Sequence, residues 1–369
     1  MPAASNAIAI KTAKPTPTLV APPRRALGSA KVNAFLSGKD LDHFRRGLLR
    51  WYDCHRRNLP WRETSDPYRI WLSEIMLQQT RVAAVLDHYR IFIDRFPTVE
   101  ALAAAAEDVV LAAWSGLGYY RRARMLHQCA LEIVEQHDGR FPRNAEALRA
   151  LPGIGRYTAA AVASIAFAEP RALADGNVER VLGRLNGINL TTVETWQHAQ
   201  ALLDESRPGD FNQAMMELGA TVCVPRKPHC RSCPVEKWCM TRGEILSAER
   251  TTRQTKKQIW CALECRDDNG DGRKVRLVRR SMKASIMPGM WELPQSSEPP
   301  RTLPESAHWR TFRHSITVTD YTVHVLRPAP LGVGPSLDPF KGKWIAIPHI
   351  SRLPITGLTR KILKAGGII

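Results

Sequence analysis

Apolar residues recur every three or four positions along most of the first two thirds of the chain, which is the spacing of helices that bury one face. Pro, Gly and Asn/Asp turns separate the segments that carry this pattern. No run of alternating apolar and polar residues interrupts them, so residues 41–247 are predicted to form one all-α domain. The clearest helical segments are 68–96, 99–115, 121–137, 144–151 and 154–168.

The pattern changes after the polar, charged stretch 248–257, which we interpret as a linker. Segments 258–265 and 275–280 alternate between apolar and polar residues, and the turn-rich stretch 267–272 separates them, which predicts a β-hairpin. The second domain, residues 258–369, is therefore predicted to be α+β. Further strands are expected at 317–326 and 343–347, and a helix at 358–364.

Length and composition fit this two-domain organisation. The chain has 369 residues, of which 44% are hydrophobic and 24% charged, as is usual for a globular protein. No apolar run reaches the roughly 18 residues of a membrane helix, so a membrane-spanning protein is excluded. Residues 1–40 lack the apolar core of a secretory signal and are predicted to be a disordered basic arm, with an organelle transit peptide as the alternative.

The net charge of +18 is unevenly distributed along the chain. Residues 41–222 contain 21 Arg, 22 acidic residues and no Lys, so the excess lies in the N-terminal arm and beyond Cys223. This placement is typical of a protein that binds a polyanion such as nucleic acid. A membrane surface is the weaker alternative, because no basic amphipathic helix with a large apolar face is found.

Four of the eight cysteines, Cys223, Cys230, Cys233 and Cys239, lie within 17 residues. Such crowding predicts a metal or cluster site in a reducing compartment rather than a disulfide framework. The spacing favours an iron–sulfur cluster over structural zinc, which more often shows two separate short-spaced pairs. Zinc remains the alternative.

A glycine-rich turn, Leu151-Pro-Gly-Ile-Gly155, precedes a predicted helix that begins near Arg156. Two glycines permit a tight turn, and the free N–H groups of a helix start can bind a phosphate. Gly153, Gly155 and Arg156 are therefore predicted to contact a DNA backbone. An ordinary helix–turn–helix corner is the alternative.

Two carboxylates lie at positions that fit either a structural or a functional role. Asp175 and Asn177 directly precede a predicted helix, where residues of this type usually cap the helix. Glu74 shares a helix face with Ile70, Trp71 and Leu77. A carboxylate on such a face is either an ion-paired core residue or an acid whose pKa burial has raised.

In order along the chain, these motifs resemble the helix-hairpin-helix superfamily of DNA glycosylases, and most closely the adenine DNA glycosylase (MutY) family. The resemblance covers about residues 41–239 and continues more weakly beyond them. It rests on the hairpin, the cysteine loop and the motifs Leu59-Pro-Trp-Arg62, Trp71-Leu-Ser-Glu-Ile-Met-Leu-Gln-Gln-Thr80, Gly116-Leu-Gly-Tyr-Tyr120, Asp175-Gly-Asn-Val178 and Phe211-Asn-Gln-Ala-Met-Met-Glu-Leu-Gly219.

The resemblance implies a [4Fe–4S] cluster on the four cysteines and excision of an adenine flipped out of the DNA stack. It implies that Glu74 is the general acid that protonates the leaving base, and that Asp175 stabilises the oxocarbenium-like sugar. Asn177 and Tyr157 are implied to lie near the reacting sugar. The resemblance further places Trp61, Arg62 and Glu217 around the adenine, and Gln78 and Tyr119 as wedges in the stack.

One position separates subclasses. Lyase members similar to endonuclease III carry, after the hairpin Arg, a Lys that forms a Schiff base, and here that residue is Tyr157. No Lys occurs between Lys39 and Lys227, so no amine of the helical region can replace it. A monofunctional glycosylase is therefore expected, with an endonuclease III-like glycosylase/lyase as the alternative.

The C-terminal domain resembles the Nudix (MutT)-like domain of the same family around Arg279-Arg280 and Pro288–Pro294, but no Glu-rich Mg²⁺-binding helix follows. The domain is therefore expected to recognise a lesion and not to hydrolyse nucleotides. The family reads 8-oxoguanine through a Phe-Ser-His turn after an Arg-His pair. Here Arg313-His314 precedes Ser315–Val318, so Thr317 would supply the hydroxyl and Val318 replaces His, which leaves the selectivity open.

We therefore expect a monomeric base-excision-repair enzyme that acts on double-stranded DNA with adenine opposite 8-oxoguanine or guanine. We expect it to be intracellular and to work with DNA, in a bacterial cytoplasm or nucleoid, without a membrane partner. A non-enzymatic DNA lesion-binding protein and a Nudix-type nucleotide hydrolase are the alternatives from other classes.

Overall fold

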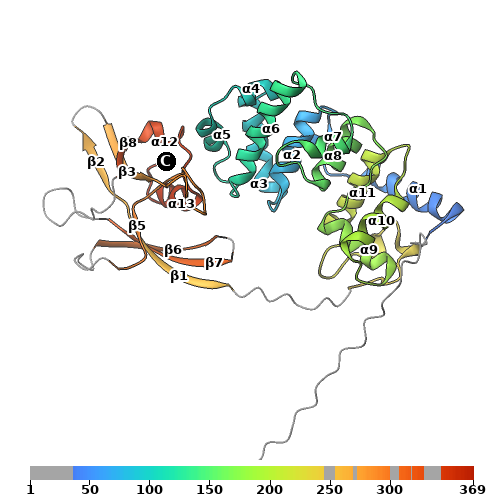
Figure 1. The fold of residues 1–369 in the computed structure, drawn as a ribbon. Helices are drawn as coiled ribbons and strands as arrows, with labels where there is room; N and C mark the ends of the chain where they lie inside the picture. Colours follow the sequence, from blue (N-terminus) through green and yellow to red (C-terminus); the bar gives the residue numbers. More distant parts are fainter. Residues whose placement is uncertain (1–35, 245–253, 269–271, 300–306, 317, 328–341) are drawn as a thin grey trace, which may run out of the picture. The chain divides into compact units, whose positions relative to one another are not determined.

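The structure is a computed structural model that describes residues 36–244, 254–268, 272–299, 307–316, 318–327 and 342–369 (Figure 1). Thr317, most of the predicted arm and the first part of the predicted linker lie outside these ranges. Among the described residues, no helix combines the length and the apolar character that crossing a bilayer requires.

The first part of the chain is all-α, as the pattern predicts. Its first helix begins at Gly38, within the predicted arm, and Asp40 in its first turn suits the positive end of a helix dipole. The helices are α1 (Gly38–His55), α2 (Pro67–Leu77), α3 (Val82–Arg95), α4 (Val99–Ala103), α5 (Glu107–Ala113), α6 (Arg121–His137), α7 (Ala145–Ala150), α8 (Arg156–Phe167), α9 (Gly176–Asn186), α10 (Thr192–Leu202) and α11 (Pro208–Thr221), with 3₁₀ turns at Pro60–Arg62, Cys230–Ser232 and Glu236–Trp238.

Two segments with continuous helical spacing are in fact broken. The segment 68–96 divides into α2 and α3, because Gln79 adopts a left-handed conformation with φ of 55° that no α-helix continues. The segment 99–115 likewise divides into α4 and α5. Apolar spacing hides these breaks, since the residues on both sides face the same core.

Helix α8 packs between the two apolar cores of the helical part. Trp71, Phe92 and Trp114 lie in the first core, and Phe44 and Phe211 lie in the second. The alanines of α8 divide between the two cores and allow close approach on both sides. The candidate site described below draws its residues from the elements around both cores.

The described residues of the second part of the chain form two sheets. One has the strand order β5-β1-β7-β6, with β1 and β7 parallel, and the other has β3 paired with β2, β4 and β8. Residues such as Val275, Val323 and Ile362 form its apolar core. The elements are β1 (Thr255–Ala262), β2 (Cys265–Asp268), β3 (Gly272–Arg279), β4 (Trp291–Glu292), β5 (Gln295–Ser296), β6 (His308–Ile316), β7 (Thr319–Leu326), β8 (Lys343–Ala346), α12 (Ile347–Ile350) and α13 (Gly357–Ala365).

Two sequence-based predictions need correction here. Strand β1 begins at Thr255, inside the predicted linker, because its charged first residues are exposed while their backbone pairs with β7. The predicted hairpin forms between β2 and β3, whereas β1 belongs to the other sheet. Strand β6 was not predicted, since most of its side chains are polar and exposed and it lacks a regular apolar alternation.

Candidate active site

A cavity of about 550 Å³ in the helical part gathers most of the residues predicted to be catalytic or to bind the substrate. It is lined from α2, α8, α9, α11 and the segment before α2. Eight predicted site residues line it: Trp61, Arg62, Glu74, Gln78, Tyr157, Asp175, Asn177 and Glu217.

Glu74 is the acid of this cavity. It lies on α2 with only 6% of its surface exposed, and burial raises its pKa to about 7, with a smaller contribution from the charge of Asp175. The Tyr157 hydroxyl donates a hydrogen bond of 2.8 Å to Glu74 Oε2 and opposes this rise. A carboxyl group with such a pKa can hold a proton near neutral pH and release it to a reacting group.

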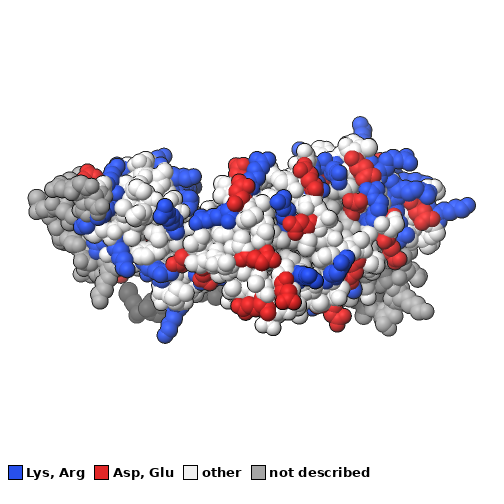
Figure 2. Space-filling model, turned by 90° about the horizontal axis from the view of Figure 1, so that it is seen from above, with Lys and Arg blue, Asp and Glu red and all other residues white. Residues whose placement is uncertain are grey.

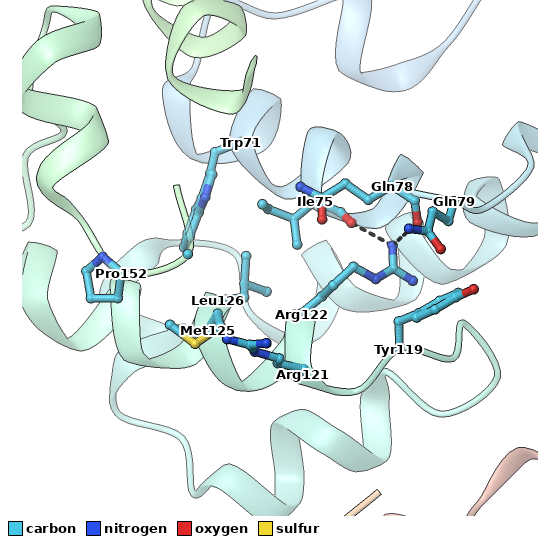
Figure 3. A pocket seen from close by; sticks show the side chains of 11 residues that line it. Trp71, Ile75, Gln78, Gln79, Tyr119, Arg121, Arg122, Met125, Leu126 and Pro152 are labelled. Carbon is cyan, nitrogen blue, oxygen red and sulfur yellow. Dashed lines mark hydrogen bonds between the residues drawn. The ribbon is translucent and has the colours of Figure 1, made fainter. Parts of the chain in front are cut away.

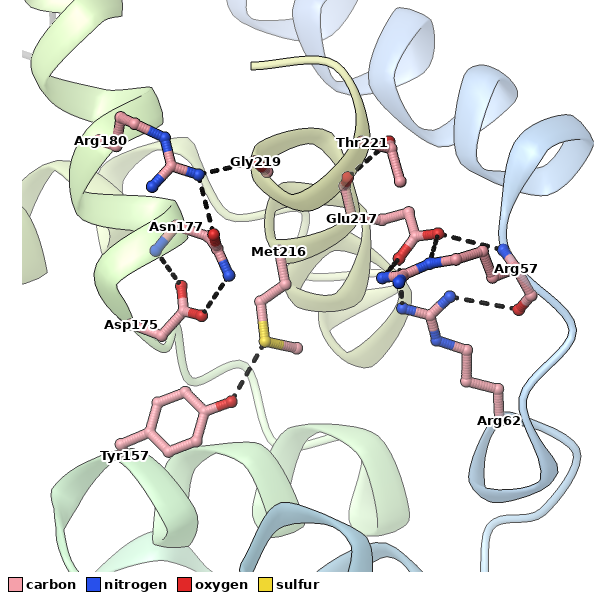
Figure 4. Close-up of polar contacts among 10 residues, drawn as sticks. All are labelled: Arg57, Arg62, Tyr157, Asp175, Asn177, Arg180, Met216, Glu217, Gly219 and Thr221. Atoms are coloured by element: carbon pink, nitrogen blue, oxygen red, sulfur yellow. Dashed lines mark hydrogen bonds and ion pairs between the residues drawn. The ribbon is translucent and has the colours of Figure 1, made fainter. Parts of the chain in front are cut away.

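Tyr157 remains protonated in this arrangement. Burial raises the pKa of its hydroxyl well above the ordinary value, and the neighbouring charge of Glu74 adds to the effect. The same hydroxyl lies 3.2 Å from Met216 Sδ on α11 (Figure 4). Through Glu74 and Met216, Tyr157 therefore links α8 to α2 and α11.

Asp175 has the opposite environment. It caps the N-terminus of α9 and accepts hydrogen bonds from the backbone N–H groups of Asn177 and Val178, at 2.9 and 2.8 Å, and from Asn177 Nδ2 at 2.9 Å. Three N–H donors and the helix start stabilise a negative charge on this carboxylate. The cap that the sequence predicted is therefore present, and the capping residue also lines the cavity.

A second buried carboxylate, Glu217, is fixed by two arginines (Figure 4). Its Oε2 accepts from Arg57 Nη2 at 2.7 Å and Arg62 Nη2 at 2.8 Å, and its Oε1 accepts from Arg57 Nε at 2.7 Å. Burial alone would raise the pKa of Glu217, but these hydrogen bonds and charges outweigh it and lower the pKa to about 2. The cavity therefore contains a permanent anion with a fixed orientation.

The close approach of α9 and α11 depends on Gly219. A Cβ there would lie 2.6 Å from Asn177 Cβ and 3.0 Å from its carbonyl oxygen. Arg180 reinforces the contact, donating to Asn177 Oδ1 at 2.8 Å and to the Gly219 carbonyl at 2.7 Å. Asn177, and through it Asp175, is thus held in place by the neighbouring helix.

The predicted hairpin connects α7 to α8. Gly153 has φ of +73°, and a Cβ there would lie 2.6 Å from Met125 Cβ, so the turn requires glycine. Gly155 is the N-cap of α8 with an ordinary φ of −83°. Gly153, Gly155 and Arg156 are all exposed, so a phosphate can reach the turn.

Tyr119, in contrast, lines a second cavity, of about 430 Å³, together with Gly153 and the Gln78–Gln79 turn (Figure 3). Tyr119 is half exposed with φ of 47°, and Gln79 is exposed with φ of 55°. Left-handed conformations in residues other than glycine cost roughly 1–3 kcal/mol each and concentrate at functional sites. Gln79 lines both cavities, so it stands between them.

The four predicted ligand cysteines meet around one small cavity. The Cys223 sulfur accepts from Arg184 Nη1 at 3.3 Å, and the Cys239 sulfur accepts from the Arg242 backbone N–H at 3.4 Å. Hydrogen bonds of this kind stabilise thiolates that bind a metal or a cluster. Within the described residues, no group of three or more His, Cys, Asp or Glu side chains is arranged to hold a single metal ion.

Sequence reasoning missed three residues of this region. Arg57 precedes the Leu59–Arg62 motif with no local signal, and only its long-range contact with Glu217 reveals it. Arg180 lies one helical turn after Asn177, which was a usable signal. Gln79 adjoins the predicted Gln78, and a left-handed residue between two helices cannot be read from apolar spacing.

Surface charge does not identify the site by itself. On the face shown in Figure 2, basic and acidic side chains are interspersed, and no broad described area carries one sign. On this face, charge alone therefore does not mark a nucleic-acid site.

Comparisons with known proteins identify relatives of this chain. The model of the HhH-GPD superfamily of base excision DNA repair proteins matches residues 72–205. The chain is 44% identical over 241 residues to the adenine DNA glycosylase of Homo sapiens, covering 60% of this chain and 44% of that protein. It is 31% identical over 322 residues to the adenine DNA glycosylase of Schizosaccharomyces pombe, covering 69% of each.

Among solved structures, a thermostable thymine-DNA glycosylase is 32% identical with a TM-score of 0.52, and the match covers 55% of this chain and 96% of that one. The chain spans less than half of the length of the human relative.

Proposed function

The chain belongs to the adenine DNA glycosylase family, and from this membership and the cavity we propose that it is a monofunctional DNA glycosylase of base excision repair. Its substrate would be double-stranded DNA with adenine opposite 8-oxoguanine or guanine. The observation that carries the proposal is the pair of carboxylates in one cavity, one with a pKa near 7 and one surrounded by N–H donors.

The two carboxylates divide the work of breaking the N-glycosidic bond. A flipped adenine would receive the Glu74 proton on its ring nitrogen as the bond to the sugar lengthens, which makes the base a better leaving group. The Asp175 carboxylate would stabilise the positive charge that develops on the sugar. Water then adds to the sugar carbon, and the products are free adenine and an abasic site.

The other cavity residues would orient the base. The Glu217 carboxylate already accepts two hydrogen bonds on each oxygen, so it would act by fixing Arg62, whose guanidinium is a donor for the base. Trp61 contributes an aromatic wall. Asn177 and Tyr157, which contact the two catalytic carboxylates, would keep them aimed at the sugar and the base.

The absence of Lys between residues 39 and 227 supports a monofunctional reaction. A lyase needs an amine that attacks the sugar to form a Schiff base. Tyr157 occupies the position of that amine in endonuclease III-like enzymes, and its raised pKa keeps its hydroxyl neutral.

The cysteine loop fits a [4Fe–4S] cluster. Four thiols line one small cavity, and their spacing along the chain, with a single Cys-x-x-Cys pair, favours a cluster over zinc. Cys223, Cys230, Cys233 and Cys239 would hold the cluster, which would cross-link the loop and bring redox-active iron to it.

The sheet-containing part would act as a Nudix-like lesion-recognition domain. Arg313 and His314 lie on β6 just before its turn into β7, and Val318 at that turn is 54% exposed. This turn would face the base opposite the adenine, where Thr317 would supply a hydroxyl.

Single-turnover base release tests the proposal. Duplexes would carry adenine opposite 8-oxoguanine, guanine or thymine, and strand breaks would be counted with and without alkali. We expect release opposite the two guanines, with breakage only after alkali. Breakage without alkali would indicate a lyase, and tight binding without release would indicate a non-enzymatic lesion binder.

A further inference from the structure

We propose that Arg122 is a positioning residue that fixes the two exposed loop tips, Gln79 and Tyr119, at the separation needed to open the DNA stack. This inference rests on the proposed function, because it assigns the tips to the step that delivers the base to the cavity. Arg122 itself is half-buried on α6, and its guanidinium lies between the Gln78–Gln79 turn and Tyr119 (Figure 3).

One guanidinium ties both loops together. Its Nη1 donates to three carbonyls at the end of α2, and its Nη2 donates to the loop that carries Tyr119 and to the Thr80 hydroxyl. The acceptors are the carbonyls of Ile75 (2.7 Å), Met76 (2.9 Å), Gln78 (2.6 Å), Leu117 (3.1 Å) and Gly118 (3.3 Å), and Thr80 Oγ1 (3.1 Å).

The acceptor carbonyls belong to the backbone next to Gln79 and Tyr119, so their positions determine where the two loop tips lie. The last carbonyls of a helix have no partner within it, and here Arg122 satisfies them immediately before Gln79. On the other side, Arg122 bonds the two residues that precede Tyr119, and its guanidinium lies 5.6 Å from the Tyr119 ring centre. Both tips therefore depend on one side chain.

Backbone strain at the two tips explains why the hydrogen bonds from Arg122 are needed. Gln79 and Tyr119 both adopt left-handed conformations, which persist only where surrounding contacts hold them. A lysine would keep the charge of Arg122 but has one nitrogen and cannot reach two loops with a planar fork. The Gln79 tip also separates the two cavities, so its displacement would alter the mouth of the site.

The test compares two substrates that differ in the cost of opening the stack. One is a duplex with adenine opposite guanine, and the other has the same adenine as an unpaired bulge, where extrusion costs less. Single-turnover release would be measured for wild type, Arg122→Lys and Thr80→Val. Arg121→Lys is the matched control, because Arg121 is the exposed neighbour that lines the same cavity.

We expect Arg122→Lys to slow release from the paired duplex by about 10–100-fold, as a small misplacement of a positioning group does, and from the bulge by less than about threefold. Thr80→Val removes one of the Arg122 contacts, so it should also slow release more from the paired duplex than from the bulge, but by a smaller factor. It replaces Arg122→Lys in the test if that variant fails to fold. If Arg122→Lys slows adenine release equally from both substrates, or from neither, the proposal is overturned. Wild type that releases adenine from neither substrate would instead refute the proposed function.

Discussion

Replacing Tyr157 by Phe should move the pH dependence of base release toward alkaline pH. The variant keeps the ring and deletes only the hydroxyl that donates to Glu74 at 2.8 Å. That hydrogen bond favours the ionised form of Glu74 and so lowers its pKa. Without it, the carboxyl group should keep its proton at higher pH.

The size of the shift follows from the strength of this bond. A hydrogen bond to a charged group is worth about 1.5–3 kcal/mol and a neutral one about 1 kcal/mol, so the ionised form loses roughly 0.5–2 kcal/mol more than the protonated form. One pKa unit corresponds to about 1.4 kcal/mol, which gives a rise of about one unit. The pKa of Glu74 should therefore move from about 7 to roughly 8.

The assay is single-turnover release of adenine from pH 5 to 9. A general acid works only when protonated, so the rate constant should fall as pH rises through the pKa of Glu74. For Tyr157→Phe this fall should occur about one unit higher. Tyr68→Phe is the control, because it removes a buried hydroxyl that bonds the Phe96 carbonyl and does not line the cavity. An unchanged midpoint, or one displaced to acid, would refute the reasoning.

Three further predictions concern the surrounding structure. Glu217→Gln should lower the free energy of unfolding by about 3 kcal/mol at pH 7, since it breaks a buried ion pair. Because the pKa of Glu217 is lowered in the folded state, the difference in urea-unfolding free energy between variant and wild type should vanish as pH falls from about 4 to about 2. A difference that does not change with pH would contradict this prediction. Gly219→Ala should slow base release at least about tenfold by displacing Asn177, with DNA binding by anisotropy nearly unchanged; a wild-type rate would show that the helices tolerate the methyl group. Cys233→Ser should remove the visible absorbance of an iron–sulfur cluster whereas Cys54→Ser should not, and retained absorbance in the first variant would argue against that ligand set.

Much of the site could be predicted because its signals are local. Asp175 and Asn177 are adjacent to a helix start, where the spacing predicts an ordinary cap, and Glu74 is a carboxylate on an apolar helix face. The family resemblance, and not the spacing, implies that they are catalytic. The turn at Gly153 is also local, since its left-handed φ demands glycine.

The remaining features depend on tertiary contacts. Arg57 lies 160 residues from Glu217, and nothing near it in sequence indicates the pairing. Gln79 is left-handed, and contacts such as those from Arg122 hold the adjoining backbone. Local conformational preference does not predict such a conformation, because it depends on tertiary contacts. Strand β6 forms because backbone pairing with β7 needs no apolar alternation when most side chains face solvent.

The most direct test of the central claim is the release of free adenine by wild type and Glu74→Gln from a duplex with adenine opposite guanine, measured in a single turnover with enzyme in excess. Gln has nearly the shape of Glu but cannot deliver a proton. Wild type should release adenine, and the variant should bind the duplex comparably but release adenine about 10²–10⁴-fold more slowly, the usual contribution of a general acid. A variant that releases adenine within about tenfold of the wild-type rate would contradict the assignment of Glu74 as the acid.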